Sequence, residues 1–325
     1  MIARKDDSVR IPSIAGLDIA VLMGGVSVER DVSLHTGEQV VSALNGSGAA
    51  ATALDTADLG FIDALRHNRF DAVFICLHGR LGEDGTVQGL LELLGLPYVG
   101  SGVLASALAM DKVMSKQLFE MHGLRTAEHV VLRRDVPVDV QDITAALGPK
   151  TVVKPAGEGS AVGVSIVHDP SELPAAVAGA FQHDRIVLVE RFVAGTEVTV
   201  GVLGNDEPFA LPTLEIVPDH EFYDYESKYT PGMSRHIIPA RVSSESRDEC
   251  SSLALDAHRV LGCRGMSRAD TIVAEDGAVY LLEVNTIPGM TATSLLPDAA
   301  RAAGIEFPDL CALLVGYALE DRRKN

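Results

Sequence analysis

The residues of this sequence that could bind a metal ion are concentrated in the segment 266–290, MSRADTIVAEDGAVYLLEVNTIPGM. The segment predicts two strands joined by Asp276-Gly277, because Asp-Gly is a favoured two-residue loop of the type I′ hairpin. Counting outward from that loop pairs Asp270 with Glu283, and residues that lie opposite each other or two apart share a face of the hairpin. Four polar side chains are therefore expected on one face: Arg268, Asp270, Glu283 and Asn285.

This polar face suits a magnesium site. Two carboxylates directly opposite each other repel unless a cation lies between them. Carboxylate and amide oxygens suit Mg²⁺, which proteins bind through carboxylates together with substrate phosphates. The alternative is a solvated strand face behind a buried face of Tyr280, Leu282 and Val284. That alternative does not explain why the polar set continues into Asn-Thr-Ile-Pro-Gly, so the metal interpretation is favoured, and it requires a phosphate.

A phosphate-binding loop is indicated by the glycine-rich segment 151–167, TVVKPAGEGSAVGVSIV. It predicts two strands, the first ending at Lys154, and a loop that contains Gly159 and Ser160. The segment lacks the GK[ST] ending and the following helix of a Walker P-loop, but a loop between strands can present backbone N–H groups to phosphates. An ordinary hairpin with a mobile tip is the alternative. The Lys-Pro start and the serine at the tip favour phosphate binding.

A parallel, doubly wound sheet is expected in the N-terminal part, because strand and helix patterns alternate there. The alternating elements are a strand at 17–25, a helix at 29–44, a strand at 70–79 and a helix at 87–95. Ligands of such sheets lie beyond the carboxyl ends of the strands, and those ends carry GGVSVER and HGRLGEDG. Neither is a G-x-G-x-x-G motif, so a dinucleotide is not indicated.

Glu29 and His78 follow these two strands and are candidates for substrate binding. Each has a simpler explanation. An acid in the first turn of a helix is favoured by the helix dipole, so Glu29 taken alone is equally consistent with either role. His78 taken alone is more often structural, and the neighbouring glycines are consistent with tight turns.

The middle of the chain supplies two lysines and a long loop. A helix over 105–124 places Lys112 and Lys116 four residues apart on one face. The loop 219–235 is polar and aromatic without a clear period, which is typical of a lid or binding loop. An exposed, disordered insertion is the alternative, but it would contain fewer aromatic residues.

The C-terminal part of the sequence predicts further strands and helices. The segment 185–204 predicts two strands that change direction at Ala194-Gly195, which suits a boundary between domains. An amphipathic helix is expected at 246–263. Another helix begins near Ser294 and Leu295, where free N–H groups would suit a carboxylate.

Composition narrows the classes of partner. The 325 residues carry a formal net charge of −18, which argues against a general nucleic-acid or anionic-membrane binder. The four cysteines are scattered without CxxC or Cys/His spacing, as expected of free thiols in a reducing cytosol. Residues 1–16 have no apolar signal region and are expected to form a flexible leader. No apolar run approaches the length of a membrane span, so a cytoplasmic protein is expected.

Taken together, these motifs resemble those of the D-alanine–D-alanine ligases of the ATP-grasp superfamily, from about Leu17 to Leu319. The resemblance is carried by GGVSVERDVSL, LHGRLGEDGTVQGLLELLGLPYVGSG, MDKVMSK, VVKPAGEGSAVGVS, FYDYESKY, SRAD and LLEVNTIPGMTATSLLP. Several long motifs in the right order are specific, whereas any one of them would not be.

The resemblance implies a mixed α/β and α+β protein, an ATP-grasp fold preceded by a Rossmann-like parallel-sheet domain. The expected parts are the leader 1–16, the Rossmann-like substrate domain 17–103, the central domain with the glycine-rich flap 104–191, and the C-terminal domain with the lid 192–325. ATP would lie between the last two domains. The family also implies cytoplasmic peptidoglycan precursor synthesis and, commonly, a homodimer.

The implied reaction joins two D-alanine molecules. The γ-phosphoryl group of ATP passes to the carboxylate of the first D-alanine, the amine of the second attacks the acyl phosphate, and phosphate leaves from a tetrahedral intermediate. Such chemistry depends on charge neutralisation and alignment. By resemblance, Asp270, Glu283 and Asn285 hold two Mg²⁺ (or Mn²⁺) ions, with Glu283 bridging them, and Arg268 stabilises the oxyanion.

The resemblance also assigns residues to the substrates. Phosphate contacts fall on Lys112, Lys154, Gly159, Ser160 and Lys228. Glu190 and Glu197, which alone could be solvated strand residues, match the adenine- and ribose-contacting positions. Contacts to D-alanine fall on Glu29 for the first ammonium, on His78 and Arg268, and on Ser294 and the Leu295 N–H for the second carboxylate. Ser160 and Tyr229 match a hydrogen-bonded pair with Glu29 that closes the lid.

One departure and three alternatives accompany this assignment. Ala161 stands where many members have a second serine, so one hydroxyl of the loop is missing, and backbone N–H groups are expected to suffice for the phosphates. A D-alanine–D-lactate ligase typically differs at the position of Tyr229, so Tyr229 after Lys228 favours an amine acceptor. Another ATP-grasp ligase would lack GGVSVER and NTIPGMTATSLLP. A non-catalytic nucleotide-binding regulator is expected to lose Arg268 or a metal ligand first, and all are present.

Overall fold

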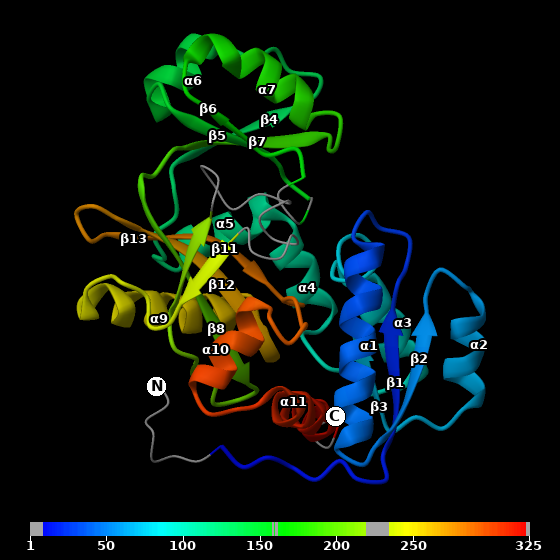
Figure 1. The fold of residues 1–325 in the computed structure, drawn as a ribbon. Helices are drawn as coiled ribbons and strands as arrows, with labels where there is room; N and C mark the ends of the chain where they lie inside the picture. The colour runs from blue at the N-terminus through cyan, green and yellow to red at the C-terminus, as the bar shows by residue number, and fades with distance from the viewer. Residues whose placement is uncertain (1–8, 158, 160–161, 219–233, 323–325) are drawn as a thin grey trace.

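The computed structural model describes most of the chain, and within the described residues the strands form three sheets (Figure 1). The described residues are 9–157, 159, 162–218 and 234–322. The predictions about Ser160, Lys228 and Tyr229 therefore lie outside them. So does the predicted lid loop, except for Ser234 and Arg235, which belong to a strand.

The first sheet is parallel with the strand order β2-β1-β3, which confirms the predicted N-terminal parallel sheet. Its elements are β1 (Asp18–Met23), α1 (Arg30–Gly46), β2 (Ala50–Asp55), α2 (Gly60–His67), β3 (Ala72–Ile75) and α3 (Thr86–Leu94). The sequence patterns do not predict β2 or α2. The residues of β2 are exposed or half-buried, so this strand lacks the buried apolar run by which β1 and β3 are recognised.

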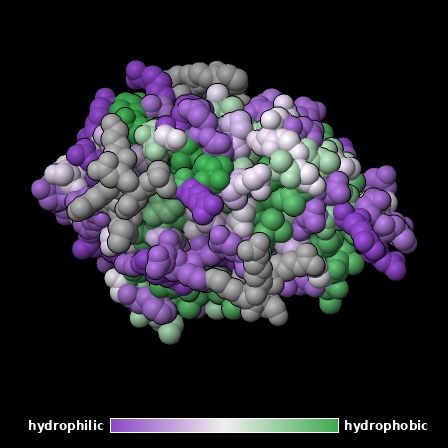
Figure 2. All heavy atoms as spheres, turned by 90° about the horizontal axis from the view of Figure 1, so that it is seen from below, coloured by the Kyte–Doolittle hydropathy of each residue, from purple (hydrophilic) through white to green (hydrophobic). Residues whose placement is uncertain are grey.

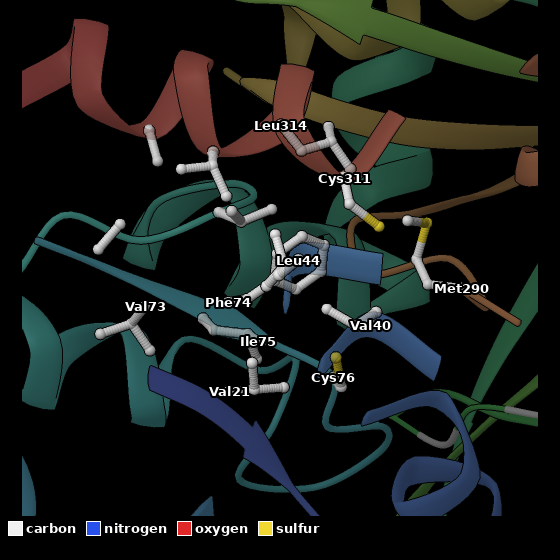
Figure 3. Close-up of a cluster of buried hydrophobic side chains, with 14 of the residues drawn as sticks. Val21, Val40, Leu44, Val73, Phe74, Ile75, Cys76, Met290, Cys311 and Leu314 are labelled. Atoms are coloured by element: carbon white, nitrogen blue, oxygen red, sulfur yellow. The ribbon is translucent and has the colours of Figure 1, made fainter. Parts of the chain in front are cut away.

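The core of the first sheet continues into the last helix of the chain, α11 (Phe307–Arg322). Phe74 of β3 and Leu44 of α1 belong to the same buried cluster as Cys311 and Leu314 of α11, and Figure 3 shows them gathered there. The two ends of the chain therefore share one core, and α11 lies beside α1 in Figure 1.

The second sheet is antiparallel with the strand order β4-β7-β5-β6. Its elements are β4 (His129–Arg133), α6 (Val140–Leu147), β5 (Thr151–Pro155), β6 (Ser165–Val167), α7 (Leu173–Ala180) and β7 (Ile186–Arg191). Thr151 pairs with Val167, so the predicted strand, glycine-rich loop and strand are confirmed. The helices α6 and α7 cover one face of this sheet at the top of Figure 1.

The third sheet has the strand order β11-β10-β8-β12-β13, and the short β9 pairs with β8. Its elements are β8 (Gly195–Gly204), β9 (Phe209–Ala210), β10 (Leu214–Pro218), β11 (Ser234–Ile237), α9 (Ser244–Val260), β12 (Gly265–Ala274), β13 (Val279–Asn285) and α10 (Leu295–Ala302). β7 and β8 lie in different sheets, so the change of direction at Ala194-Gly195 leads from one sheet to the next. The helices predicted at 246–263 and from Ser294 onward are present as α9 and α10.

The single helix predicted over 105–124 is wrong, because Asp111 divides it into α4 (Val103–Met110) and α5 (Lys112–Met121). Asp111 has extended backbone angles, and its carboxylate accepts hydrogen bonds from the backbone N–H groups of residues 113 and 114, each at 3.0 Å. Aspartate is a preferred N-cap for this reason. A helix therefore starts anew at Lys112.

The hairpin of β12 and β13 turns through a longer loop than the predicted Asp276-Gly277 turn. Gly277 has a φ of 85° and donates its N–H to the carbonyl oxygen of Ala274 at 2.9 Å. Val273 pairs with Val279 next to the loop. These features are typical of a three-residue loop built on a type I turn. The predicted type I′ turn is wrong, and the pairing near the loop is shifted by one residue.

A β-bulge at Leu282 cancels that shift. The register changes after Asp270, so that Asp270 pairs with Glu283 and Arg268 pairs with Asn285, as predicted. The pairing of the polar residues is confirmed, although the count that leads to it contains two errors of opposite sign.

The bulge also reverses the face that some β13 side chains occupy, because a shift of one residue moves a side chain to the other face of a sheet. Val279 and Leu281 are fully buried, whereas Tyr280 and Leu282 are half-buried. The predicted buried face is therefore right at Val284 and wrong at Tyr280 and Leu282.

Residues 9–16 pack against the first sheet, so the prediction of a flexible leader over 1–16 is wrong for this part. Ile14 is 2 % exposed and belongs to the core of the first sheet. Gly16 donates its backbone N–H to the carbonyl oxygen of Gly48 at 2.8 Å. The apolar residues of the segment explain why it is held.

Hydrophilic residues are spread over the face of the molecule shown in Figure 2, and hydrophobic residues lie between them in separate groups. Among the described residues no single helix is long and apolar enough to cross a membrane. α10 and α11 reach that length and composition only as a pair bent by 102°.

Candidate active site

A cavity of about 180 Å³ lies where the second and third sheets meet. Lys154 and Glu190 line it from the second sheet, and Glu197, Asp270 and Glu283 line it from the third. The strands of both sheets thus bring together residues that the sequence predicts for phosphate, nucleoside and metal. The apolar part of the lining includes Val152, Val164, Ile166, Phe192, Ile272 and Leu282.

The carboxylate of Asp270 accepts hydrogen bonds from three neighbours. Arg268 binds it at both oxygens, with Nε to Oδ1 at 2.9 Å and Nη2 to Oδ2 at 2.7 Å. Asn285 Nδ2 donates to Oδ2 at 3.0 Å, and Thr199 Oγ1 donates to Oδ1 at 2.6 Å. Thr199 pairs with Asp270 across β8 and β12. The sequence gives no sign of Thr199, because only the pairing of two distant strands places it there.

The second carboxylate of the hairpin, Glu283, also has a cation beside it. Lys112 Nζ lies 3.3 Å from Glu283 Oε2. The sequence prediction directs Lys112 toward phosphate, and the structure places it against a predicted metal ligand as well as in the wall of the cavity. Lys112 and Arg268 therefore offset the repulsion between the cross-strand pair Asp270 and Glu283.

The donor set of this face fits a hard divalent cation. Two carboxylates stand opposite each other, and Asn285 turns its amide nitrogen toward Asp270, which leaves the amide oxygen for another partner. Oxygen ligands of this kind are those that Mg²⁺ prefers. Within the described residues no three His, Cys, Asp or Glu side chains are clustered as metal ligands, so a metal here would depend on the asparagine.

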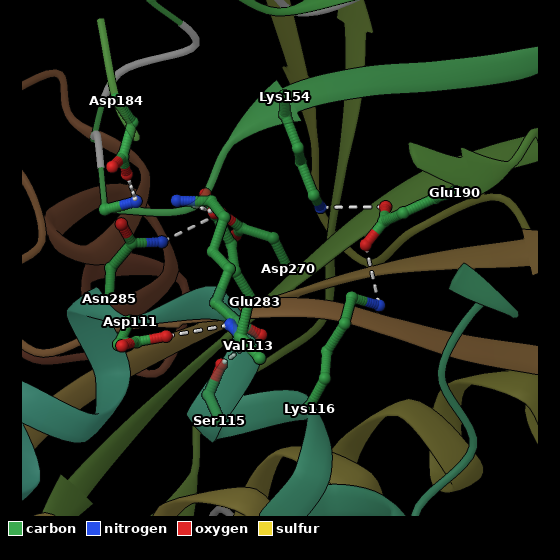
Figure 4. Close-up of polar contacts among 12 residues, drawn as sticks. Asp111, Val113, Ser115, Lys116, Lys154, Asp184, Glu190, Asp270, Glu283 and Asn285 are labelled. Carbon is green, nitrogen blue, oxygen red and sulfur yellow. Dashed lines mark hydrogen bonds and ion pairs between the residues drawn. The ribbon is translucent and has the colours of Figure 1, made fainter. Parts of the chain in front are cut away.

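Glu190 lies between two lysines (Figure 4). Lys116 Nζ is 2.8 Å from Oε1, and Lys154 Nζ is 2.8 Å from Oε2. All three residues are buried. Burial alone would raise the pKa of Glu190, but Lys154 and Lys116 hold it below its usual value. Burial lowers the pKa of Lys116, and Glu190 opposes that effect.

Glu29 lies at the N-terminus of α1, 3 % exposed, where the first sheet meets the glycine-rich loop. Gly79 has a φ of 70°, and a Cβ on it would come 3.1 Å from Glu29 Oε2, so glycine lets the backbone approach the carboxylate. A Cβ on Gly159 would lie 3.7 Å from the same oxygen. The predicted partners Ser160 and Tyr229 lie outside the described residues.

His78 lies in the same region and is buried. Burial lowers its pKa below the usual value, the charge of Arg268 adds to this effect, and Glu29 opposes it. The ring is therefore neutral near pH 7. Among the described residues, its buried Nε2 has no hydrogen-bond partner.

Glu83 is a site residue that the sequence interpretation misses. Its Oε1 accepts the N–H of Gly79 at 2.8 Å. Burial and the charge of Glu29 raise its pKa to about 8, while Lys112 lowers it. Glu83 also lines a cavity of about 20 Å³ with Glu283. Its position in the HGRLGEDG segment, after a buried strand, is the signal that could have identified it.

Ser294 and Leu295 lie at the start of α10, as predicted, but Ser294 does not cap the helix with its side chain. Its Oγ instead accepts the N–H of Thr291 at 3.1 Å and lies 2.7 Å from the Thr291 hydroxyl. In the same loop Ala292 donates its N–H to Gln39 Oε1 at 2.6 Å. The loop before α10 is thus tied to α1, the helix that begins beside Glu29.

Comparison with known proteins identifies the family. The model of the D-ala D-ala ligase C-terminus matches residues 118–316, and that of the D-ala D-ala ligase N-terminus matches residues 51–101. A D-alanine–D-alanine ligase of Pelotomaculum thermopropionicum is 49 % identical over 311 residues, which cover 94 % of this chain and 98 % of that protein. The one of Geobacter sulfurreducens is 51 % identical over 294 residues, covering 90 % and 91 %.

Solved structures agree with the sequence comparison. The D-alanine–D-alanine ligase of Bacillus anthracis complexed with ATP superposes with a TM-score of 0.84 at 32 % identity, covering 95 % of this chain and 99 % of that one. The ligase of Coxiella burnetii gives a TM-score of 0.84 at 27 % identity, covering 95 % of each chain. The predicted ATP-grasp architecture is confirmed, and the chain belongs to the D-alanine–D-alanine ligase family.

Proposed function

We propose that this protein joins two molecules of D-alanine into D-alanyl-D-alanine with ATP, for peptidoglycan precursor synthesis. The observation that carries the proposal is the meeting of three groups of residues. The second sheet brings Lys154 and Glu190 to a cavity, the hairpin brings Asp270 and Glu283 to its opposite wall, and the glycine-rich loop reaches Glu29. The names of the relatives and the ATP complex of the Bacillus anthracis protein support the choice of substrates.

The nucleotide would occupy the cavity between the second and third sheets. Its lining is apolar enough for a base, and Glu190 and Glu197 supply polar contacts for the nucleoside. Lys154 and Lys112 supply positive charge for the phosphates, and the loop at Gly159 would supply backbone N–H groups. Ser160 and Lys228 remain predictions for the same role.

Asp270, Glu283 and Asn285 would hold two Mg²⁺ or Mn²⁺ ions. When bound, the ions would neutralise charge on the β- and γ-phosphoryl oxygens. Arg268 and Lys112 are the chain's own cations at this wall, and they hold the two carboxylates in place through the contacts described above.

The first D-alanine would place its ammonium at Glu29 and its carboxylate toward Arg268. A γ-phosphoryl P–O bond of ATP breaks to release ADP, and a new P–O bond forms to the carboxylate oxygen. The amine of the second D-alanine then forms the C–N bond, loses a proton, and expels phosphate. Arg268 would stabilise the oxyanion, a neutral His78 would donate or accept a hydrogen bond, and Ser294 with the Leu295 N–H would bind the second carboxylate.

The organisation proposed for the whole chain follows the three sheets. The boundaries at 103/104 and 191/192 place one sheet in each domain, and α4 and α5 lead from the first sheet to the second. We further propose that the protein acts in the cytoplasm as a homodimer and has no nucleic-acid or membrane partner.

The test is release of phosphate from ATP by the purified protein. Release should require both D-alanine and a divalent cation, and Glu283→Ala should abolish it, while Glu38→Gln on the exposed side of α1 should not. ATP binding without turnover would identify a regulator instead. The product is then assayed with D-alanine and D-lactate supplied together at neutral pH. Mainly D-alanyl-D-lactate would contradict the assignment of the amine as acceptor.

A further inference from the structure

Lys116 is a buried cation for which the reaction above has no use. Its side chain is 0 % exposed, and it does not line the cavity. Its Nζ lies 2.8 Å from Glu190 Oε1 as an ion pair and donates to Thr126 Oγ1 at 3.2 Å. Placing an ammonium group in the protein interior is costly unless a specific partner compensates.

Lys116 reaches Glu190 from a different element of the fold. α5 carries Lys116, whereas Glu190 is on β7 of the second sheet, and Figure 4 shows the two lysines approaching the carboxylate from opposite sides. The N-terminus of α5 also binds the end of β5, through a hydrogen bond from Lys112 N to Ala156 O of 3.0 Å. β5 and β7 are paired strands, with Val152 opposite Glu190, so Lys154 reaches Glu190 from within the sheet, whereas Lys116 reaches it from the helix that packs against the end of β5.

The charges of this group depend on Lys116. The 2.8 Å ion pair with Glu190 Oε1 favours the ammonium form of Lys116, and in that form one carboxylate is shared by two ammonium groups, so the group carries a net positive charge at the wall of the cavity. Without Lys116, Glu190 and Lys154 would form a one-to-one pair with no net charge. The pairing would then compete directly with any phosphate for the Lys154 ammonium, because a buried ion pair is strengthened by the low local dielectric.

We propose that Lys116 is a positioning residue of the nucleotide site. It holds one oxygen of Glu190 so that Lys154 is only partly neutralised and its ammonium remains able to bind the phosphate chain. This inference rests on the proposed nucleotide site. It assigns Lys116 no contact with the nucleotide, so its effect must appear through Lys154.

The test compares ligands that differ in their phosphates. Binding of ATP, ADP and adenosine to the full chain is measured by isothermal titration calorimetry in EDTA, so that the lysines act without metal. Lys116→Met should lower the ratio of ATP to adenosine affinity by roughly tenfold, the loss expected when one charge-assisted hydrogen bond is weakened. ADP should show the same direction. Leu65→Ala in the core of α2, away from the cavity, is the control for a destabilised protein and should leave the ratio unchanged.

A second variant separates the charge effect from a loss of structure. In the background Glu190→Gln the carboxylate that competes for Lys154 is absent, so adding Lys116→Met should change the ratio by less than about twofold. The double variant also removes both members of the ion pair, so no buried charge is left without its partner. It can therefore be measured even if Lys116→Met alone does not fold. If Lys116→Met weakens ATP and adenosine in equal proportion, or if the loss persists in the Glu190→Gln background, the inference is wrong. If the unmodified protein does not bind ATP, the proposed function fails instead.

Discussion

The raised pKa of Glu83 predicts that folding stability depends on pH in a way that one substitution removes. Burial and the charge of Glu29 raise the pKa from 4.5 to about 8. A carboxyl whose pKa is higher in the folded state binds a proton there that the unfolded chain releases. The folded state is therefore favoured by this group below about pH 4.5, and the contribution is lost as the pH rises toward 8.

The size of the effect follows from the shift and from the exposure of the side chain. Each tenfold change in proton affinity corresponds to about 1.4 kcal/mol, so the full shift would correspond to about 4–5 kcal/mol. Glu83 is half-buried rather than fully enclosed, and solvent reduces electrostatic effects at such positions. We therefore expect roughly 1–3 kcal/mol between pH 5 and pH 8.

Urea denaturation at pH 5, 6.5 and 8, in EDTA and without nucleotide, measures this effect. The free energy of unfolding of the unmodified protein minus that of Glu83→Gln should fall by roughly 1–3 kcal/mol over this range. His78, whose lowered pKa gives a dependence of the opposite sign, is present in both proteins and its contribution is largely subtracted. Glu38→Gln, an exposed carboxyl on α1, is the matched control. A difference for Glu83→Gln that stays constant with pH would refute the reasoning.

Two further predictions concern the hairpin. Asp270→Ala removes the carboxylate that Arg268 binds at both oxygens. We expect the free energy of unfolding in urea to fall by about 3–5 kcal/mol and turnover to be lost. A variant as stable as the unmodified protein would contradict the energetic importance of the pair. Gly277→Ala forces a side chain into a backbone conformation with a φ of 85°. It should lower the free energy of unfolding by about 1 kcal/mol without changing the KM for ATP. Asparagine tolerates that conformation better than alanine, so Gly277→Asn should lower the free energy of unfolding by less.

Local patterns predict the hairpin's polar face but not the backbone that produces it. Alternation and an Asp-Gly pair place Asp270 opposite Glu283 only because two errors cancel: the turn has three residues instead of two, and a bulge follows at Leu282. The bulge has no signature in the residue types around it, because it inserts an ordinary leucine. The prediction therefore succeeds for the pairs and fails for the side chains between the loop and the bulge.

Residues whose position depends on contacts between distant parts of the chain are the ones that sequence reasoning misses. Thr199 reaches Asp270 only because β8 pairs with β12. Glu83 owes its raised pKa largely to burial and to Glu29, which follows a different strand. By contrast, Glu29 and His78 are accessible to prediction, since parallel strands bring their carboxyl ends to one edge of a sheet.

The break at Asp111 shows how a local feature can set the geometry of the whole site. Because the aspartate caps α5, the helix starts at Lys112, and its first two turns present Lys112 to the third sheet and Lys116 to the second. A helix that continued from α4 without interruption would have a different axis. It would not direct Lys112 to Glu283 and Lys116 to Glu190 at the same time. The spacing of four residues, which the sequence shows, makes the two lysines neighbours. The capping carboxylate is hidden in a continuous helical pattern, yet it determines where those neighbours point. The charge at both walls of the cavity between the second and third sheets therefore depends on a side chain that is not part of the cavity lining.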